Sequence, residues 1–474
     1  MSGEDSYGEL MMESFDYEGI WWLPESVDNK VAGRLQFSKT EGLILNLIGT
    51  LNPTFGFNET NKYPLVHGLT QTGKSFTLQN VFETGLHIGL PGFNSQTLDA
   101  TIAFSGAHFD SLDQIKFDMM HVEYNHLGKW VDTSGLSYSI FDEDGNFERL
   151  EANYAYPEEV TAYLTDVKIT PTYTFNINIP AMHPVEELQL KQKIYLKVEA
   201  DNALSLETAM RRFILPFRNL LTFATNSPNF ITKLTGFFSN NQGTKSDEST
   251  ESSINIFFQE NNSSTVSKAS PLFTLKDVKN DFSDLLQKWF TIADELDSVC
   301  NLFFGVLYSD QMYSEHKFAS FVHAAESYHR HRFKNEVLPK AEHKQMVKEI
   351  VDQVLEKHQA WLKEKLAYSN ETRFRDRIRD LIDFAGAVID PLIGDKEDFV
   401  SSVANTRNYN THYDIRLKDR ALRDADLYWL SQTLSFLVQI CLLRELGFSA
   451  ERCVDIFANN QEYLYAIRRI QQAR

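Results

Sequence analysis

The spacing of apolar side chains changes near residue 205 of this 474-residue chain, and this change limits the fold more than any other feature. In residues 42–49, 74–82 and 173–179, apolar and polar side chains alternate, and Gly, Asn, Pro and Asp separate such runs. That period of two predicts short β-strands. After residue 271 apolar residues recur every three or four positions, which predicts amphipathic helices. We therefore expect an α+β multidomain protein, with a β-rich, sandwich- or barrel-like domain followed by an all-α bundle.

The domain boundary is expected in a polar stretch. Residues 1–235 form the β-rich domain, whose end is helical and interrupted at Pro216. Residues 236–270 read as a polar linker, because two Ser-rich segments flank a short apolar piece, Ile254–Phe258. Residues 271–474 form the helical domain, beginning with one long predicted helix over 275–303 and including another over 342–366.

Charge is distributed unevenly between the two halves. The net charge of −19 divides into −16 for residues 1–270 (18 Lys and Arg against 34 Asp and Glu) and −3 for residues 271–474 (28 against 31). An acidic first half repels phosphate backbones, so any nucleic acid should bind the second half. The acidic start lacks the form of a secretory signal, and no run of about 18 apolar residues indicates a membrane span. We expect a cytoplasmic protein that does not contact membranes.

The cysteines and histidines do not form a metal-binding pattern. Cys300, Cys441 and Cys453 lie on apolar faces of predicted helices and read as reduced core thiols. The histidines of the first half lack ligand spacing. No metal and no cofactor are expected.

One segment matches a phosphate-binding motif in sequence but not in its predicted secondary structure. Gly68–Ser75 matches the P-loop pattern, whose mechanism needs a helix directly after the loop. The residues that follow, Phe76-Thr-Leu-Gln, alternate as in a strand. We favour a hairpin turn, and a P-loop nucleotide-binding protein stays as the less favoured alternative.

The residues best suited to catalysis lie in the segment Arg407-Asn408-Tyr-Asn-Thr-His412. RNA can be cut without a metal, because its own 2′-OH can attack the adjacent phosphate. An imidazole can move the protons, a guanidinium can stabilise the negative phosphorane, and an amide can orient an oxygen. Among the 13 histidines only His412 has an Arg five to seven residues upstream. On an ideal helix Arg407 and His412 lie about 140° apart. They can therefore reach one phosphate only if the long Arg side chain bends toward it or the helix end loosens. From spacing alone, a surface Arg and a helix-capping His are the simpler explanation of the pair.

This segment resembles the Arg-x4–6-His motif of HEPN domains, with Asn408 as the polar residue after Arg. The Gly-Lys-Ser-Phe-Thr-Leu turn and the later Phe217-Arg-Asn-Leu-Leu-Thr-Phe-Ala-Thr are similar to the amino-terminal domain of ApeA proteins. The resemblance implies an antiviral, abortive-infection endoribonuclease with Arg407, Asn408 and His412 as catalytic residues. It also implies an amino-terminal sensor for an infection signal such as a phage protein, an RNA substrate (tRNA for example), and a homodimer or larger homo-oligomer that pairs two motifs. A non-catalytic HEPN-like interaction module is the main alternative.

Other charged groups have weaker assignments. Glu326, on the apolar side of its helix, is a candidate carboxylate for orienting Arg407. The cluster 328–332 offers either RNA contact or a solvated helix face. The alternate arginines from Arg373 to Arg379 are expected to form ion pairs with nearby aspartates. A basic group beyond the motif is placed to meet phosphates, namely Arg416, Lys418, Arg420 and Arg423.

Overall fold

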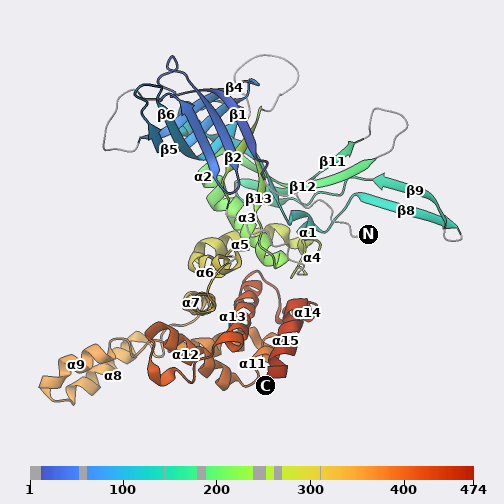
Figure 1. Cartoon of the computed structure of the whole chain (residues 1–474). Helices are drawn as coiled ribbons and strands as arrows, with labels where there is room; N and C mark the ends of the chain where they lie inside the picture. Colours follow the sequence, from blue (N-terminus) through green and yellow to red (C-terminus); the bar gives the residue numbers. More distant parts are fainter. Residues whose placement is uncertain are drawn as a thin grey trace. The chain divides into compact units, whose positions relative to one another are not determined.

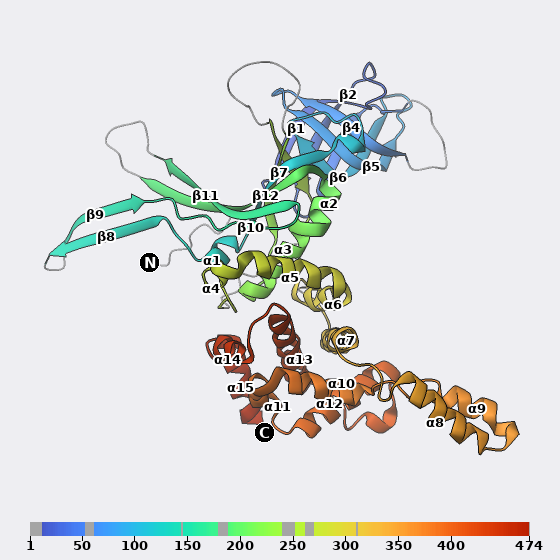
Figure 2. The same cartoon turned by 180° about the vertical axis from the view of Figure 1, so that it is seen from behind.

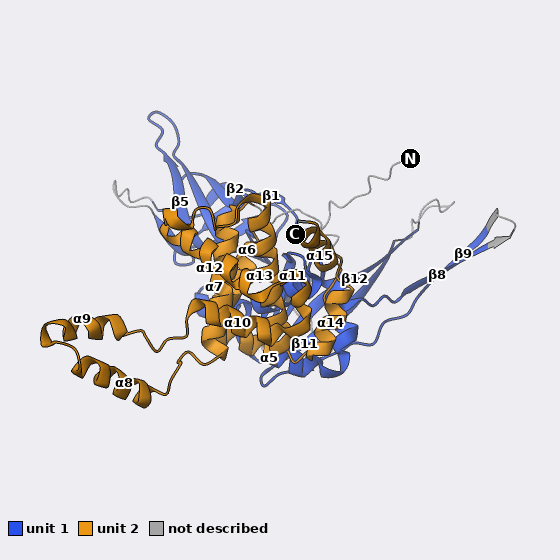
Figure 3. Cartoon of the chain, turned by 90° about the horizontal axis from the view of Figure 1, so that it is seen from below, with its two compact units in different colours: residues 1–266, 273–287 blue, residues 267–272, 288–474 orange. Residues whose placement is uncertain are grey.

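The computed structural model describes residues 12–52, 61–143, 146–178, 188–238, 252–260, 270–309 and 311–473. The chain divides into two compact units, coloured separately in Figure 3. Unit 1 comprises residues 1–266 and 273–287, and unit 2 comprises residues 267–272 and 288–474. The architecture is the predicted one, since unit 1 is rich in strands and unit 2 is helical.

Unit 1 contains a closed barrel of antiparallel strands (Figure 1). Its strands are β1 (Phe15–Trp22), β2 (Val31–Ser38), β3 (Gly42–Ile48), β4 (Lys62–Thr70), β5 (Ser75–His87) and β6 (Ser95–Ser105). They pair in the order β6-β3-β2-β1-β4-β5, and β5 pairs with β6 to close the ring. Alternate side chains point inward and are almost fully buried, among them Trp21, Leu35, Leu45, Val66, Leu78 and Leu98. The period of two in the sequence is therefore the inward–outward alternation of a barrel.

The barrel continues into a second part of the same sheet through β6. The first half of β6 pairs with β3, whereas its second half pairs with β14 (Ser252–Phe258). The sheet then runs through β13 (Ile231–Phe238), β7 (Lys116–Tyr124), β12 (Gln189–Ser205), β11 (Val167–Asn178) and β10 (Ala162–Tyr163). The apolar piece that interrupts the predicted polar linker is thus β14, a strand with Ile254 and Ile256 buried. β8 (Leu136–Glu143) and β9 (Asn146–Tyr154) form a separate ribbon.

Short helices follow the sheet of unit 1. After α1 (Leu127–Val131), the helical end predicted near residue 205 consists of α2 (Leu206–Ala209), a π-helical turn (Met210–Ile214) and α3 (Leu215–Thr225). Pro216 occupies the first turn of α3, directly after the π-helical turn. The Trp130 ring of α1 lies 5.9 Å from the Phe282 ring, and the Lys279 ammonium lies 2.7 Å from the Glu158 carboxylate. Residues 273–287, which sequence reasoning assigned to the helical half, therefore pack within unit 1.

The long helix predicted over 275–303 is broken. It consists of α4 (Leu275–Val278), a 3-10 turn (Lys279–Asp281), α5 (Phe282–Glu295) and α6 (Asp297–Leu307). Leu296 separates the last two with φ −113° and ψ 35°, which is not a helical conformation. No Pro or Gly marks this break, and Leu296 is fully buried at it. The break therefore follows from core packing, which the apolar spacing does not encode.

Unit 2 is a helical bundle built around α13 (Asp424–Glu445), which packs most extensively on α7 (Ser314–Arg332). The other helices of the bundle are α6, α10 (Phe374–Ala385), α11 (Asp390–Ile393), α12 (Lys396–His412), α14 (Ala450–Ala458) and α15 (Gln461–Ala473). α13 is long and apolar enough to cross a membrane, but 78% of its apolar window is buried inside the protein. It therefore serves as the core helix of the bundle.

A helical hairpin is inserted in the chain between α7 and α10. The single helix predicted over 342–366 is in fact two, α8 (Lys340–Asp352) and α9 (Glu356–Leu366), joined by a short turn. They project away from the other helices of unit 2, as Figures 1 and 2 both show. A β-bridge between Glu336 and Glu371 joins the two chain segments at the base of this hairpin.

Candidate active site on helix α12

All three predicted catalytic residues lie in the last turns of α12. The Asp395 side chain caps the start of this helix by accepting the Asp398 N–H at 2.9 Å. Phe399, Val400 and Val403 are buried and hold one face of α12 against the bundle. The helix runs without a break to His412, its last residue.

The end of α12 is sharply defined. Tyr413 adopts a left-handed conformation with φ 50°, and its N–H donates to the Tyr409 carbonyl at 2.6 Å. His412 is therefore exposed at the helix end, where a ligand can reach it. In the described parts of the chain its side chain makes no hydrogen bond or ion pair.

Arg407 points toward the bundle and meets groups from two other helices. Its Nη2 atom lies 3.9 Å from the Glu326 carboxylate on α7, and its guanidinium carbon lies 5.3 Å from the centre of the Phe374 ring on α10. The Arg407 side chain is 29% exposed and that of Glu326 only 17%, so the ion pair is partly shielded from water. The carboxylate partner expected for Arg407 is present, whereas Phe374 carried no recognisable sequence signal.

Asn408 joins the Arg407 side chain to the face that carries His412. The Arg407 Nη1 atom donates to the Asn408 Oδ1 atom at 3.2 Å. Asn408 and His412 are four residues apart, so their side chains lie one turn apart on the same face of α12. Asn408 therefore links the guanidinium to that face, although the Cα of Arg407 lies about 140° from that of His412 around the helix axis. No hydrogen bond joins Arg407 to His412 within the described residues.

The same face of α12 receives another arginine, from α10. The Arg375 guanidinium donates from Nη1 to Ser401 Oγ at 2.8 Å and from Nη2 to Asn405 Oδ1 at 3.1 Å. The ion-pair role expected for the alternate arginines holds for Arg379, which contacts Asp376 and Glu397. It does not hold for Arg375, whose partners are neutral.

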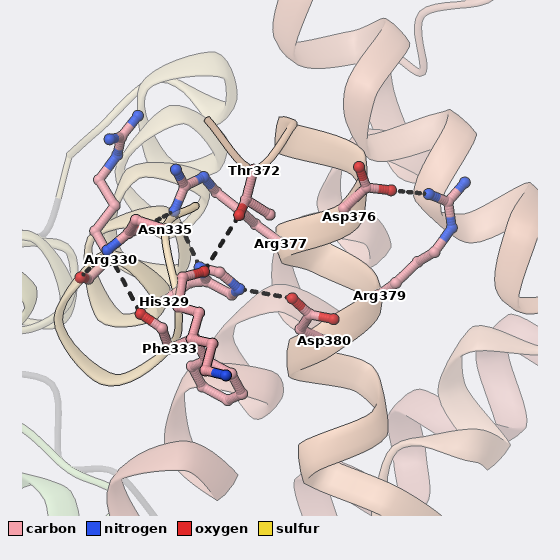
Figure 4. A network of polar contacts seen from close by, with 10 residues as sticks. His329, Arg330, Phe333, Asn335, Thr372, Asp376, Arg377, Arg379 and Asp380 are labelled. Atoms are coloured by element: carbon pink, nitrogen blue, oxygen red, sulfur yellow. Dashed lines mark hydrogen bonds and ion pairs between the residues drawn. The ribbon is translucent and has the colours of Figure 1, made fainter. Parts of the chain in front are cut away.

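A buried polar network ties α7 to α10 behind the site (Figure 4). The His329 ring is fully buried and lies with Nε2 2.8 Å from Asp380 and with Nδ1 3.0 Å from Arg377 Nη1. Because a guanidinium can only donate, Nδ1 accepts and the Nε2–H donates to Asp380. Burial, together with the nearby guanidinium, lowers the pKa of His329 and keeps the ring neutral.

The remaining contacts of this network fix the chain after α7. Arg377, only 1% exposed, also donates to Asn335, whose own amide donates to the Arg330 carbonyl at 2.6 Å. The predicted basic cluster 328–332 is therefore not a uniform solvated face, because Tyr328 and His329 belong to the core. The network fixes α7 relative to α10, and these helices carry the partners of Arg407.

The basic residues after the motif are partly neutralised. Arg416 holds the Asp414 carboxylate with two nitrogens, and its hydrogen bonds lower the pKa of Asp414. Arg423 donates to the Tyr409 hydroxyl at 3.2 Å and lies 5.2 Å from the Tyr409 ring centre. Of these two, Arg423 alone has a charge that no carboxylate in the described chain offsets.

The P-loop-like segment forms a β-hairpin. Gly68 lies in β4 and Ser75 begins β5. The turn between them is closed by backbone bonds from the Thr70 N–H to the Lys74 carbonyl and from the Gly73 N–H to the Thr70 carbonyl, both 3.0 Å long. Gly73 supplies the positive φ of 80°. The Lys74 ammonium donates to the Tyr17 hydroxyl at 2.9 Å. Strand β5, and not a helix, follows the turn, so the predicted hairpin is confirmed. This segment therefore lacks the strand–loop–helix arrangement that a P-loop needs to bind phosphate.

The cysteines are free and buried, and burial raises the pKa of Cys300 to about 12. Within the described ranges no group of three or more His, Cys, Asp and Glu side chains is arranged to hold a metal ion.

Two family models match the chain. The model of ApeA N-terminal domain 1 matches residues 16–289, and the model of the Apea-like HEPN domain matches residues 319–452. The first match covers the strands of unit 1 and extends into α5, whereas the second begins in α7, ends in α14 and includes α12. Neither a curated protein nor a solved structure matches the chain.

Proposed function

Since this chain belongs to the ApeA family of anti-phage HEPN proteins, we propose that it is a metal-independent endoribonuclease that acts at Arg407, Asn408 and His412. The observation that carries the proposal is the hydrogen bond from Arg407 to Asn408, on the helix face where His412 stands exposed one turn further. This arrangement offers a fixed positive charge, an oriented amide and a titratable imidazole within six residues.

The proposed reaction is attack of a ribose 2′-OH on the adjacent phosphate. The 2′-oxygen–phosphorus bond forms, the bond from phosphorus to the 5′-oxygen breaks, and a 2′,3′-cyclic phosphate remains. An imidazole removes the 2′-OH proton, and an imidazolium protonates the departing 5′-oxygen. Arg407 stabilises the extra negative charge of the phosphorane, and the Asn408 amide donates to one of its oxygens.

Two proton transfers favour a site made by two copies of the chain. Each copy contributes one exposed His412, so a homodimer supplies both a base and an acid. Arg407 and His412 of one chain lie far apart around the axis of α12. A homodimer also removes this difficulty, because His412 of the partner subunit can face Arg407 across a shared groove. A homodimer, or a larger homo-oligomer built from it, is therefore part of the proposal.

The substrate and the control of activity complete the proposal. RNA, with tRNA as the first candidate, binds unit 2, because most of the excess negative charge lies in the other half of the chain. Unit 1 acts as the sensor that releases activity when a phage component such as a protein is present. A cytoplasmic location goes with this role, because phage and host RNA meet there.

The test is to map the 3′ ends of cellular RNA after induction of the wild-type protein and of a His412→Ala variant. We expect cyclic-phosphate ends in the wild type, formed equally well with a chelator present, and none in the variant. His358→Ala is the matched control, because His358 is an exposed histidine on α9. Identical RNA ends in the wild type and the His412→Ala variant would remove the proposal. RNA binding without cleavage would instead favour the non-catalytic HEPN-like module.

A further inference from the structure

The first turn of α10 contacts α12 at the first residue of the proposed site and at two residues before it. Phe374 lies under the guanidinium of Arg407, and the next residue, Arg375, bonds to Ser401 and Asn405. Ser401 and Asn405 are four residues apart, so the Arg375 guanidinium spans one full turn of α12. One turn of α10 thus determines where two cationic groups lie.

Arg375 has neutral hydrogen-bond partners, and its charge interacts at longer range with Glu397, a carboxylate that already pairs with Arg379. Its partners are a hydroxyl and an amide oxygen, and it forms no ion pair in the described chain. By contrast, Arg379 on the same helix contacts Asp376 and Glu397. Two of the five N–H donors of the Arg375 guanidinium are used, which leaves three. A cation that is held in place by neutral groups can bind an anion without first losing a carboxylate partner.

The partners of Arg375 belong to a polar stripe along α12. Ser401, Asn405, Asn408 and His412 follow one another at intervals of four, three and four residues, which places them on one helix face. Asn405 precedes Asn408 by about 4.5 Å and His412 by about 10.5 Å along the helix axis. An RNA strand that lies along this stripe with one linkage at His412 therefore brings a phosphate one or two nucleotides away close to Arg375.

We propose that Arg375 binds an RNA phosphate one or two nucleotides from the linkage that is cut. In this role Arg375 touches the substrate but moves no proton, and it fixes the strand along α12 so that Asn408 and His412 meet one particular linkage. This inference rests on the proposed ribonuclease function and adds to it the residue that sets the position of the strand.

The test measures RNA binding separately from cleavage, in full-length protein that carries His412→Ala. A fluorescently labelled tRNA transcript is titrated at several salt concentrations. Arg375→Gln should lower the affinity about tenfold, since a charge-assisted bond to phosphate is lost. It should also make the salt dependence shallower by about one phosphate contact. Arg375→Lys keeps the charge but not the forked donors, so its salt dependence should stay unchanged while its affinity falls partway.

Arg379→Gln is the matched control, because it removes a cation that two carboxylates already offset, and it should leave the salt dependence unchanged. Equal affinity and salt dependence for Arg375→Gln and the His412→Ala parent would overturn the inference while leaving cleavage by the wild type intact. If the wild type never cuts RNA but Arg375→Gln still weakens binding, the ribonuclease proposal fails and Arg375 remains an RNA contact. If the parent binds no RNA, both fail. Should Arg375→Gln unfold, Arg375→Lys decides, and parental affinity there refutes the inference.

Discussion

Replacement of Gly68 by Ala should destabilise unit 1, because Gly68 makes room for a buried tryptophan. Gly68 pairs directly with Trp21 across strands β4 and β1. A Cβ atom at Gly68 would lie 2.1, 2.3 and 2.8 Å from three atoms of the Trp21 ring, far closer than a normal contact. Trp21 is fully buried in the barrel, so its ring cannot swing into solvent.

The expected magnitude follows from this overlap. An extra methylene in a well-packed core lowers the free energy of unfolding by about 1–3 kcal/mol. Because the new methyl group overlaps three atoms of a rigid ring, we expect Gly68→Ala to cost about 3 kcal/mol. For a unit of this size that corresponds to a fall in Tm of about 5 °C. Gly73→Ala is the matched control, because nothing lies within 4 Å of its Cβ position. Its cost is confined to the left-handed backbone at φ 80°, about 1 kcal/mol.

The assay is thermal unfolding followed by tryptophan fluorescence, with and without ATP and Mg²⁺. Gly68→Ala should melt well below Gly73→Ala, and ATP should shift neither variant nor the wild type. Lys74→Ala should lose at most about 1 kcal/mol, because Lys74 makes one exposed bond to Tyr17. The reasoning is refuted if Gly68→Ala melts like the wild type. It is equally refuted if ATP stabilises the wild type and Lys74→Ala abolishes that effect, since this is the behaviour of a P-loop.

Two further predictions concern buried polar groups. Burial between Tyr195 and Phe237 lowers the pKa of His121 to about 4, so the unfolded chain binds more protons between pH 4 and 6.5 and stability falls as pH drops through that window. When the pH is lowered from 7 to 5, the free energy of unfolding measured in urea should therefore fall by about 1–2 kcal/mol less in His121→Phe than in the wild type. Equal losses in the two proteins would contradict this account. Arg377→Met should cost about 3 kcal/mol in the same measurement, because it leaves buried acceptors on His329 and Asn335 without a donor, and an unchanged midpoint would count against it.

Much of the fold was predictable because its signals are local. Strand alternation and helical spacing report which side of each element is buried, and the barrel strands and α12 follow them closely. The hairpin at Gly68–Ser75 was also predictable, since β-forming residues follow it. By contrast, the break at Leu296 and the division of the predicted helix 342–366 into α8 and α9 carry no Pro or Gly signal at the break points.

The candidate site divides in the same way. The order Arg407, Asn408, His412 is a property of the chain, and the helix period alone places Asn408 and His412 on one face. The partners of Arg407 come from distant positions in the sequence, since Glu326 belongs to α7 and Phe374 to α10. The neutral setting of Arg375 was not predicted, because nearby aspartates made ion pairing the simplest expectation for every arginine in that run.

By itself, then, the amino-acid sequence determined the class of each half, the turn that mimics a P-loop and the identity of the three proposed catalytic residues. Only the tertiary structure decided that Phe374 lies beside Arg407, that the hydrogen-bond partners of Arg375 are neutral, and how β14 extends the barrel sheet. The physical reason is range. Backbone period and turn geometry depend on neighbouring residues, whereas a contact between helices depends on how whole surfaces pack together.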